Sequence, residues 1–239
     1  MSSAELPSPE DFIEGQIILI DKPLNWTSFQ VVNYIRSRLR RFTGKKNIKV
    51  GHAGTLDPLA TGLLIVCTGK MTKQIESYMG LEKVYSGQIQ LGATTPSFDL
   101  ETEIDQRRDT SECSKVKVKE AMQTFVGDIE QFPPMFSAIK VEGKRLYQHA
   151  RAGEQVEVRS RQVHISEFSM LDYEDNPSIL SFRVRCSKGT YIRSLARDLG
   201  EKLNVGGHLT ALRREAIGQF GIEKAVEPKS WGLPFDKLT

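Results

Sequence analysis

The chain has 239 residues, of which 39% are hydrophobic, so it is long enough for one large domain or two small ones with a packed core. Its 33 basic and 30 acidic residues leave a net charge of only +3, so any nucleic-acid surface must come from local clusters of cations. No apolar run approaches the ~20 residues that span a bilayer, and the polar, acidic N-terminus is unlike a signal peptide. Cys67, Cys113 and Cys186 are widely spaced, which predicts neither a disulfide nor a metal site and favours a reducing compartment. We therefore expect a cytoplasmic protein.

The N-terminal part of the chain predicts a leader followed by a strand and a helix. Residues 1–14 are rich in Ser, Pro and acids, which predicts a flexible leader ahead of a single domain over residues 15–239. A short strand is expected over residues 16–20. Thr27 and Gln30 have the spacing of a capping box and predict the start of a helix.

The predicted helix is amphipathic. Val31, Ile35 and Leu39 repeat at i, i+4 and i+8 and form one buried stripe. Cations gather on the opposite face and just beyond it: Arg36, Arg38, Arg40, Arg41, Lys45, Lys46 and Lys49. This region is either a solvated helix face or a surface that contacts phosphates, and its position just before the next motif favours phosphate contact.

A glycine-rich loop, GHAGTLDPLATGLL, places the carboxylate of Asp57 in a tight turn. Gly54 permits a backbone conformation that other residues resist, and Pro58 biases Asp57 towards an extended conformation. The apolar run over 63–66 predicts a strand that is buried on both faces and anchors the loop. Taken without the rest of the loop, Leu-Asp-Pro favours an ordinary turn in which Asp57 is a capping or Asx-turn residue, because Asp before Pro is a common turn starter.

The remaining pattern mixes strands and helices. Tyr85 lies on the same face of an alternating strand as Ile89 and Leu91, which by itself favours a core or cross-strand aromatic. Arg193 falls in the first turn of a helix, where a cation is mildly unfavourable unless an anion offsets it. We expect helices over 71–80 and 114–126 and from 188 onward, and strands over 83–91, 162–173 and 179–186.

A basic segment with interleaved aromatics follows Pro133 and Pro134. Aromatic faces among cations are how proteins hold unstacked nucleotides and their phosphates. An exposed hairpin with scattered lysines is the alternative. The residues concerned are Phe136, Lys140, Lys144, Arg145, Tyr147, His149 and Arg151.

The loop around Asp57 resembles the catalytic motif of the TruB family of tRNA pseudouridine synthases, which isomerise uridine-55 in the T loop. Further blocks resemble the family in the same order: DKPLNWTSFQVV, KVYSGQIQLGATTPSFD, QFPPMFSAIKVEGKRLYQHARAG, CSKGTYIRSLARDLG and GGHLTALRR. Asn25 stands where the family usually has Gly, and we expect it to be tolerated because Asn is the next-best residue for a positive φ.

The resemblance implies an α+β fold with a mixed, mostly antiparallel central sheet flanked by helices, and a mobile RNA-binding thumb over about residues 131–160. It makes Asp57 the catalytic nucleophile and Arg193 the partner of Asp57. It makes Tyr85 the tyrosine that stacks on the target base and a candidate for removing the proton from C5 of uracil. His52 would occupy the space left by the flipped base. By the same resemblance we expect further substrate contacts from Tyr191, Leu212, Lys22, Lys140 and Arg145.

The reaction breaks the C1′–N1 glycosidic bond and rejoins uracil through C5, so it needs no redox agent, and no cofactor or metal motif is found in the sequence. Whether Asp57 attacks C1′ or C6, or assists elimination to a glycal, stays open. The alternatives for function are a non-catalytic tRNA-binding or folding factor on the same scaffold, and isomerisation at another RNA site.

The implied partner is the T arm of tRNA, bound by a monomer, with no membrane and no protein partner. The sequence ends at Thr239, soon after Trp231, which leaves no room for the PUA-type domain of many bacterial relatives. On that basis a T-arm hairpin is expected to react nearly as well as whole tRNA.

Overall fold

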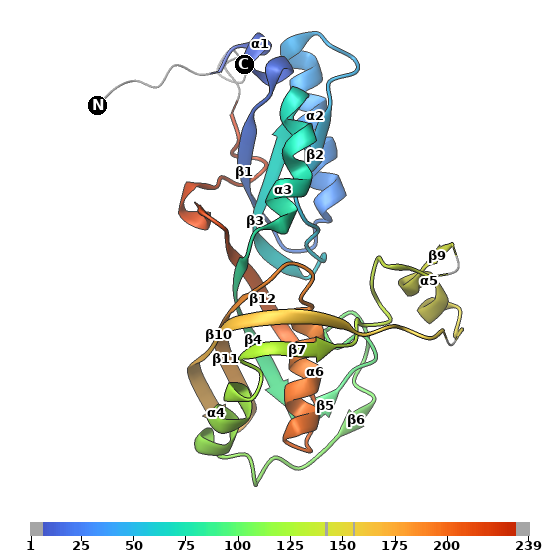
Figure 1. The fold of residues 1–239 in the computed structure, drawn as a ribbon, viewed down its shortest axis with the longest axis vertical. Helices are drawn as coiled ribbons and strands as arrows, with labels where there is room; N and C mark the ends of the chain where they lie inside the picture. Colours follow the sequence, from blue (N-terminus) through green and yellow to red (C-terminus); the bar gives the residue numbers. More distant parts are fainter. Residues whose placement is uncertain (1–6, 142, 155, 233–239) are drawn as a thin grey trace. The chain divides into compact units, whose positions relative to one another are not determined.

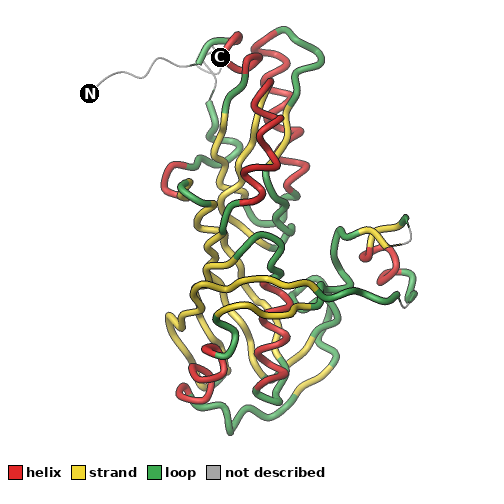
Figure 2. The backbone as a smooth tube through the Cα atoms, viewed as in Figure 1, coloured by secondary structure: helices red, strands yellow, loops and turns green. Residues whose placement is uncertain are grey.

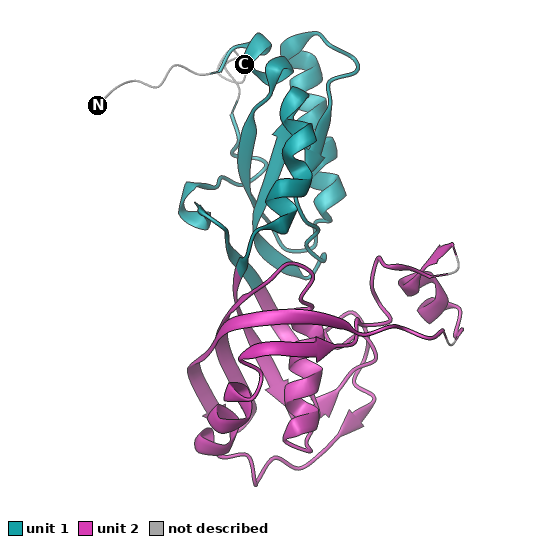
Figure 3. Ribbon diagram, in the orientation of Figure 1, with its two compact units in different colours: residues 1–83, 213–239 teal, residues 84–212 magenta. Residues whose placement is uncertain are grey.

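The chain forms two compact units (Figure 3) in a computed structural model that describes residues 7–141, 143–154 and 156–232. Unit 1 comprises residues 1–83 and 213–239, and unit 2 comprises residues 84–212. The range predicted as a single domain, 15–239, therefore contains both units. In each unit, antiparallel strands are accompanied by helices (Figure 2), which confirms the predicted α+β class with a mostly antiparallel sheet. None of the helices in the described ranges is long and apolar enough to cross a membrane.

Unit 1 is built on the strand order β1-β3-β12, with β2 paired to β3 and β13 paired to β12 (Figure 1). β1 runs antiparallel to β3 with Leu19 opposite Ile65. The strand β12 (Gly207–Ile217) is shared, because the boundary between the units falls at residues 212 and 213. The other elements are α1 (Pro9–Glu14), β1 (Ile17–Lys22), α2 (Ser28–Thr43), β2 (Val50–His52), β3 (Ala60–Thr68), the 3-10 helix η1 (Gly69–Gln74), α3 (Ile75–Gly80), β13 (Phe220–Gly221) and the 3-10 helix η2 (Ile222–Lys224).

The leader predicted over residues 1–14 is wrong for residues 8–14, which cap and form α1. Ser8 and Asp11 make a reciprocal capping box, and Pro9 occupies the first helical position. Phe12 anchors the helix: it is 3% exposed, and its ring lies 6.0 Å from the rings of both Phe42 and Trp231. The Ser-Pro-acid composition that suggested disorder is also the composition of a capped helix start. Residues 1–6 lie outside the described ranges.

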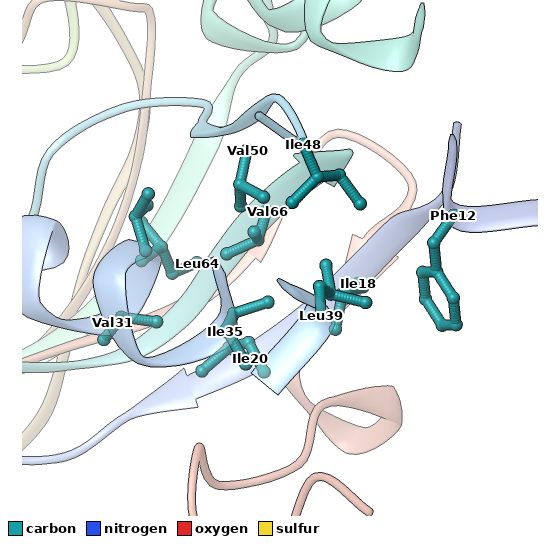
Figure 4. Close-up of a cluster of buried hydrophobic side chains, with 11 residues drawn as sticks. Phe12, Ile18, Ile20, Val31, Ile35, Leu39, Ile48, Val50, Leu64 and Val66 are labelled. Atoms are coloured by element: carbon teal, nitrogen blue, oxygen red, sulfur yellow. The ribbon is translucent and has the colours of Figure 1, made fainter. Parts of the chain in front are cut away.

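The central strand β3 is buried on both faces, as its unbroken apolar run predicted. Leu64 and Val66 pack with α2, β1 and α1 in one cluster (Figure 4), while Leu63 and Ile65 belong to a second cluster on the other face. The predicted stripe of α2 is confirmed, since Val31, Ile35 and Leu39 are fully buried; so is its capping box at Thr27 and Gln30. A rigid strand buried in this way fixes the loop that precedes it.

The helix predicted over 71–80 is divided into η1 and α3. Met71, Ile75 and Tyr78 pack against the second cluster, whereas Met79 is 45% exposed. A 3-10 helix has three residues per turn, so η1 shifts the phase of the apolar stripe from Met79 to Tyr78.

Unit 2 has the strand order β12-β4-β11-β10-β7. Antiparallel β10 and β11 bring Phe168 and Phe182 into an edge-to-face contact with ring centroids 5.7 Å apart, and Leu195 of α6 is fully buried. α6 begins at Ile192, not at residue 188 as expected, because Gly189 has a φ of 82° that a helix cannot continue through. The elements are β4 (Lys83–Leu91), β5 (Ala93–Thr94), β6 (Gln106–Arg107), α4 (Lys115–Gln123), β7 (Gly127–Gln131), β8 (Lys140–Val141), β9 (Lys144–Arg145), α5 (Leu146–Arg151), β10 (Arg161–Asp175), β11 (Ser178–Cys186) and α6 (Ile192–Lys202).

The segment predicted as a thumb forms a small hairpin followed by a short helix. Figure 1 shows β9 and α5 at the end of a segment that projects from the rest of unit 2. Leu146 is fully buried, and its N–H donates to Ile139 O at 2.8 Å. The buried ring of His149 places Nδ1 2.5 Å from a Glu154 carboxylate oxygen and Nε2 3.2 Å from Val141 O. The tip is therefore a folded element with its own small core.

Candidate active site

Asp57 lies in the turn between β2 and β3, where the sequence placed it. Ala53 N–H donates to Ile65 O at 2.9 Å, and Ala60 N–H donates to Asp57 O at 3.1 Å, so both ends of the loop are closed onto β3. Gly54 has a φ of 97°. At Gly62 a Cβ atom would lie 2.3 Å from Arg214 O, so only glycine fits there. The Asp57 side chain is half-buried.

The start of α2 holds this loop from a second side. Leu56 N–H donates to Ser28 Oγ at 2.9 Å, and Ser28 Oγ donates back to Leu56 O at 3.2 Å. Asn25 N–H donates to Pro58 O at 2.8 Å. Asn25 adopts a φ of 65°, as its substitution for the usual glycine predicted. The residues on each side of Asp57 are thus fixed by hydrogen bonds to one segment.

Lys22 was predicted to bind substrate, and the structure corrects that prediction because its side chain is 0% exposed. Its Nζ donates to Trp26 O at 2.6 Å and to Pro23 O at 3.0 Å, and lies 3.4 Å from Pro58 O. Burial lowers the pKa of Lys22 to about 8, while the Asp57 charge opposes the fall and the Arg214 charge adds to it. Lys22 is therefore a buried cation that ties the chain around Asp57 together.

Arg214 is a functional candidate that the sequence did not single out. It is 1% exposed, and its guanidinium donates to Leu63 O at 2.7 Å and to Gly54 O at 3.1 Å. These carbonyls lie on the two sides of the Asp57 turn. Arginine is rarely buried without partners. Nothing in the ALRR segment distinguishes the buried Arg214 from its neighbour Arg213, which is half-exposed and forms an ion pair with Asp21 at 2.7 Å.

His52 ends β2 and is half-buried. Burial lowers the pKa of His52, the nearby positive charge of Arg214 lowers it further, and a backbone hydrogen bond with Gly54 opposes the fall. The ring is therefore neutral at pH 7. Within unit 1 the structure brings Lys22, His52, Asp57 and Arg214 into one electrostatic cluster.

Tyr85 and Arg193 belong to unit 2. Tyr85 is 9% exposed on β4 and faces inward as its alternation predicted. Arg193 is the second residue of α6 and is 4% exposed; it donates to Phe136 O at 2.8 Å and to Ser97 O at 3.2 Å. The Asp99 carboxylate lies 3.6 Å from its Nε. This carboxylate is an anion that offsets the unfavourable helix position, whereas the pairing of Arg193 with Asp57 stays a prediction.

The other predicted substrate contacts are also in unit 2. Tyr191 precedes α6; its backbone exchanges two hydrogen bonds with the Gln131 amide, and the Arg161 guanidinium lies 5.0 Å from its ring centre. Leu212 is half-buried on β12. Lys140 and Arg145 are exposed and face one another in the β8–β9 pair.

No group of three or more His, Cys, Asp or Glu side chains in the described ranges could hold a metal ion. The three cysteines are free and buried, and burial raises the pKa of the Cys67 thiol to about 11. The Cys67 thiol on β3 is therefore protonated at neutral pH and is a weak nucleophile.

The fold is shared with solved structures. The chain superposes on a protein in the crystal structure of a Cbf5-Nop10-Gar1 complex with a TM-score of 0.65 and 27% identity, covering 95% of this chain and 57% of that one. A chain in a structure of an H/ACA RNP bound to a substrate RNA containing 2′-deoxyuridine gives a TM-score of 0.62 at 26% identity over 92% of this chain and 55% of that one. This chain spans little more than half of each. The fold is that of the pseudouridine synthases.

The sequence comparisons define the family. The profile described as "TruB family pseudouridylate synthase (N terminal domain)" matches residues 40–192, and the one described as "tRNA pseudouridylate synthase B C-terminal domain" matches residues 193–229. This chain belongs to the TruB family of pseudouridylate synthases and is an isomerase. A Flavobacterium johnsoniae protein named tRNA pseudouridine synthase B is 54% identical over 92% of this chain and 96% of its own length. A Phocaeicola vulgatus protein of the same name is 54% identical over 92% and 93%.

Proposed function

We propose that this chain converts uridine-55 in the T loop of tRNA to pseudouridine, with Asp57 as the catalytic nucleophile. The support is the complete GHAGTLDPLATGLL motif together with relatives of about half identity that carry the name tRNA pseudouridine synthase B. The partner is the T arm of tRNA, bound by a single protein chain. We place the reaction in the cytoplasm, where free thiols such as Cys67 persist.

One observation carries the proposal: Asp57 is held in a turn that is fixed from two sides and lies beside buried positive charge. Ser28 holds Leu56 and Asn25 holds Pro58, so the backbone on both sides of Asp57 is set before substrate arrives. A preorganised carboxylate loses little freedom when it reacts. An ordinary turn aspartate would not need this support.

The neighbouring cations give the carboxylate its reactive form. Asp57 must be ionised to attack a carbon atom, and burial alone would favour the neutral acid. The Asp57 charge raises the pKa of Lys22 against the effect of burial, so the reciprocal attraction stabilises the Asp57 anion. The Arg214 guanidinium, whose positive charge lowers the pKa of both Lys22 and His52, adds to this field.

The reaction is redox-neutral, because the C1′–N1 bond breaks, a C1′–C5 bond forms, the proton on C5 leaves to solvent, and N1 takes up a proton from solvent. Protein groups are needed to hold the ribose, to face the uracil and to accept the C5 proton. The family resemblance assigns Tyr85 to the base and the proton, Leu212 and Tyr191 to contacts with the target nucleotide, and Arg193 to the partnership with Asp57. These four assignments stay predictions.

The thumb binds the RNA through positively charged side chains. Lys140 and Arg145 lie directly opposite one another in an antiparallel pair, an arrangement that is destabilising between like charges unless an anion lies between them. A phosphate of the T arm would supply that anion. The folded tip, with Leu146 and His149 buried, presents the two cations on a defined scaffold.

His52 is suited to replace the extruded base. A uridine in a folded T loop has to leave its stack, at a cost of a few kcal/mol that other contacts must offset. A neutral, flat imidazole can fill the vacated space without carrying a desolvated charge into it. The lowered pKa of His52 keeps the ring neutral at pH 7.

Site mapping tests the proposal. An unmodified full-length tRNA transcript is incubated with the wild-type chain, and pseudouridine is located by carbodiimide adducts that stop reverse transcription. We expect one new stop, at the T-loop uridine. A stop only at another uridine would overturn the substrate assignment, and no stop at all, with binding retained in gel shifts, would mean that the chain is an RNA-binding factor.

A further inference from the structure

The helix that holds the Asp57 loop exposes an aromatic ring to solvent. Phe29 lies in the first turn of α2 and is 65% exposed, and Leu24, just before the helix, is 52% exposed. Neither side chain belongs to the core clusters of unit 1, which take Val31, Ile35 and Leu39 from a different face of the helix. Exposed Phe and Leu so close together gain nothing for folding.

Phe29 is the neighbour of the residue that holds the catalytic loop. Ser28 exchanges two hydrogen bonds with Leu56, which precedes Asp57. Farther along the helix, Arg36 donates to Val50 O at 2.8 Å, and Val50 begins the strand that ends in His52. One side of α2 therefore contacts both ends of the segment over residues 50–56, which carries His52 and leads to Asp57.

The exposed ring begins a continuous face of α2, which we call the α2 stripe: Phe29, Asn33, Arg36 and Arg40. Their spacings of four, three and four residues place them on one face of a helix, about 16 Å long at 1.5 Å per residue. Arg36 Nη1 donates to Asn33 Oδ1 at 2.7 Å, which holds its guanidinium in place. Arg40 is exposed and makes no ion pair within the described ranges.

We infer that the α2 stripe binds the RNA strand that continues from the target uridine, with the ring of Phe29 stacked on an unpaired base and Arg40 beside a phosphate. This inference rests on the proposed function and adds a contact to it. Aromatic side chains that stack on bases, together with cations that contact the backbone, are how proteins hold single-stranded nucleic acid. The negative backbone of RNA complements the positive charges of Arg36 and Arg40 in the stripe.

Equilibrium binding of a labelled T-arm hairpin tests the inference. All variants carry Asp57→Asn, so that no turnover occurs during the measurement. Phe29→Ala is expected to weaken binding by about 5- to 150-fold, the range found when a stacking aromatic is truncated. Phe29→Tyr should bind within about twofold of the parent, because the tyrosine ring offers the same face. Val116→Ala is the matched control, since Val116 is also 65% exposed but lies on α4.

Salt dependence separates the two parts of the stripe. Arg40→Gln should reduce the slope of log Kd against log salt by about 0.7, the value of one phosphate contact on a single strand. Phe29→Ala should leave that slope unchanged, because stacking releases no counterions. A folding defect would disturb both variants alike, and thermal unfolding of each variant checks for it.

Hairpin affinity of Phe29→Ala equal to that of the Val116→Ala control would overturn the inference, and so would an equal loss in Phe29→Tyr. This failure is distinguishable from failure of the proposed function. In the first case the wild-type chain still isomerises the T-loop uridine, and in the second it does not.

Discussion

Replacing Lys22 by methionine removes a buried charge whose energetic cost depends on pH. The side chain is 0% exposed, and burial lowers its pKa from 10.5 to about 8. Because the unfolded chain binds this proton more tightly than the folded chain does, the charged form opposes folding by roughly 3 kcal/mol below pH 8. That penalty fades as pH rises from 8 towards 10.5. Stability of the wild type should therefore rise with pH in this window.

The two pKa values of Lys22, folded and unfolded, set how the stability difference between the wild type and Lys22→Met changes with pH. Between pH 7 and pH 9 the wild type should gain about 1.3 kcal/mol of unfolding free energy relative to Lys22→Met, and by pH 10 about 2.5 kcal/mol. The variant also leaves the carbonyls of Pro23 and Trp26 without their donor, at about 1–3 kcal/mol each if they stay dry. This second loss does not vary with pH. It therefore changes the stability difference between the two proteins by the same amount at every pH and leaves its dependence on pH unchanged.

Urea unfolding of both proteins at pH 7, 8, 9 and 10 supplies the measurement, because the difference cancels the titration of all other groups. Lys119→Met, at an exposed lysine of α4, is the control and should differ from wild type by the same amount at every pH. If the difference in unfolding free energy between the wild type and Lys22→Met does not change from pH 7 to pH 10, Lys22 is not a buried, partly compensated cation.

Three further predictions follow from the contacts of the site. Arg214→Met removes both donors to the carbonyls that flank the Asp57 turn and should cost about 2–4 kcal/mol in urea unfolding, whereas Arg213→Met, at a half-exposed ion pair, should cost under about 1 kcal/mol. Because the folded pKa of His52 is lowered, the unfolded state binds more protons below pH 6.5; acid should therefore destabilise the wild type more than His52→Gln, as thermal melts from pH 7 to pH 5 can show. Asp99→Asn removes the negative charge beside Arg193 and should lower kcat by about tenfold with little change in KM. A raised KM with an unchanged kcat would contradict a positioning role for Asp99.

The sequence predicted the parts of the fold that depend on local pattern. The run over 63–66 has no polar interruption, so its burial on both faces could be read directly, and with it the placement of Asp57 in the turn before it. Thr27 and Gln30 gave the start of α2, and the alternation around Tyr85 gave its inward direction. These features need only neighbours in sequence.

Long-range contacts of charged residues could not be predicted. Lysine and arginine are expected at the surface, so the pattern gave no reason to bury Lys22 or Arg214, whose partners lie up to 160 residues away. The same limit applies to Asp99, which the sequence placed in a family block but not beside Arg193. At α1 the composition of residues 8–14 suggested disorder, and the burial of one side chain, Phe12, decided otherwise.

The most direct test of the account is tritium release from 5-tritiated uridine in a T-arm transcript, with wild type beside Asp57→Asn and with a transcript whose T-loop uridine is replaced by cytidine. Loss of the C5 hydrogen accompanies isomerisation, so we expect release by the wild type alone, and only from the transcript that carries the uridine. Release by Asp57→Asn at the wild-type rate would contradict the assignment of Asp57 as nucleophile. Release from the substituted transcript would contradict the assignment of the T-loop uridine.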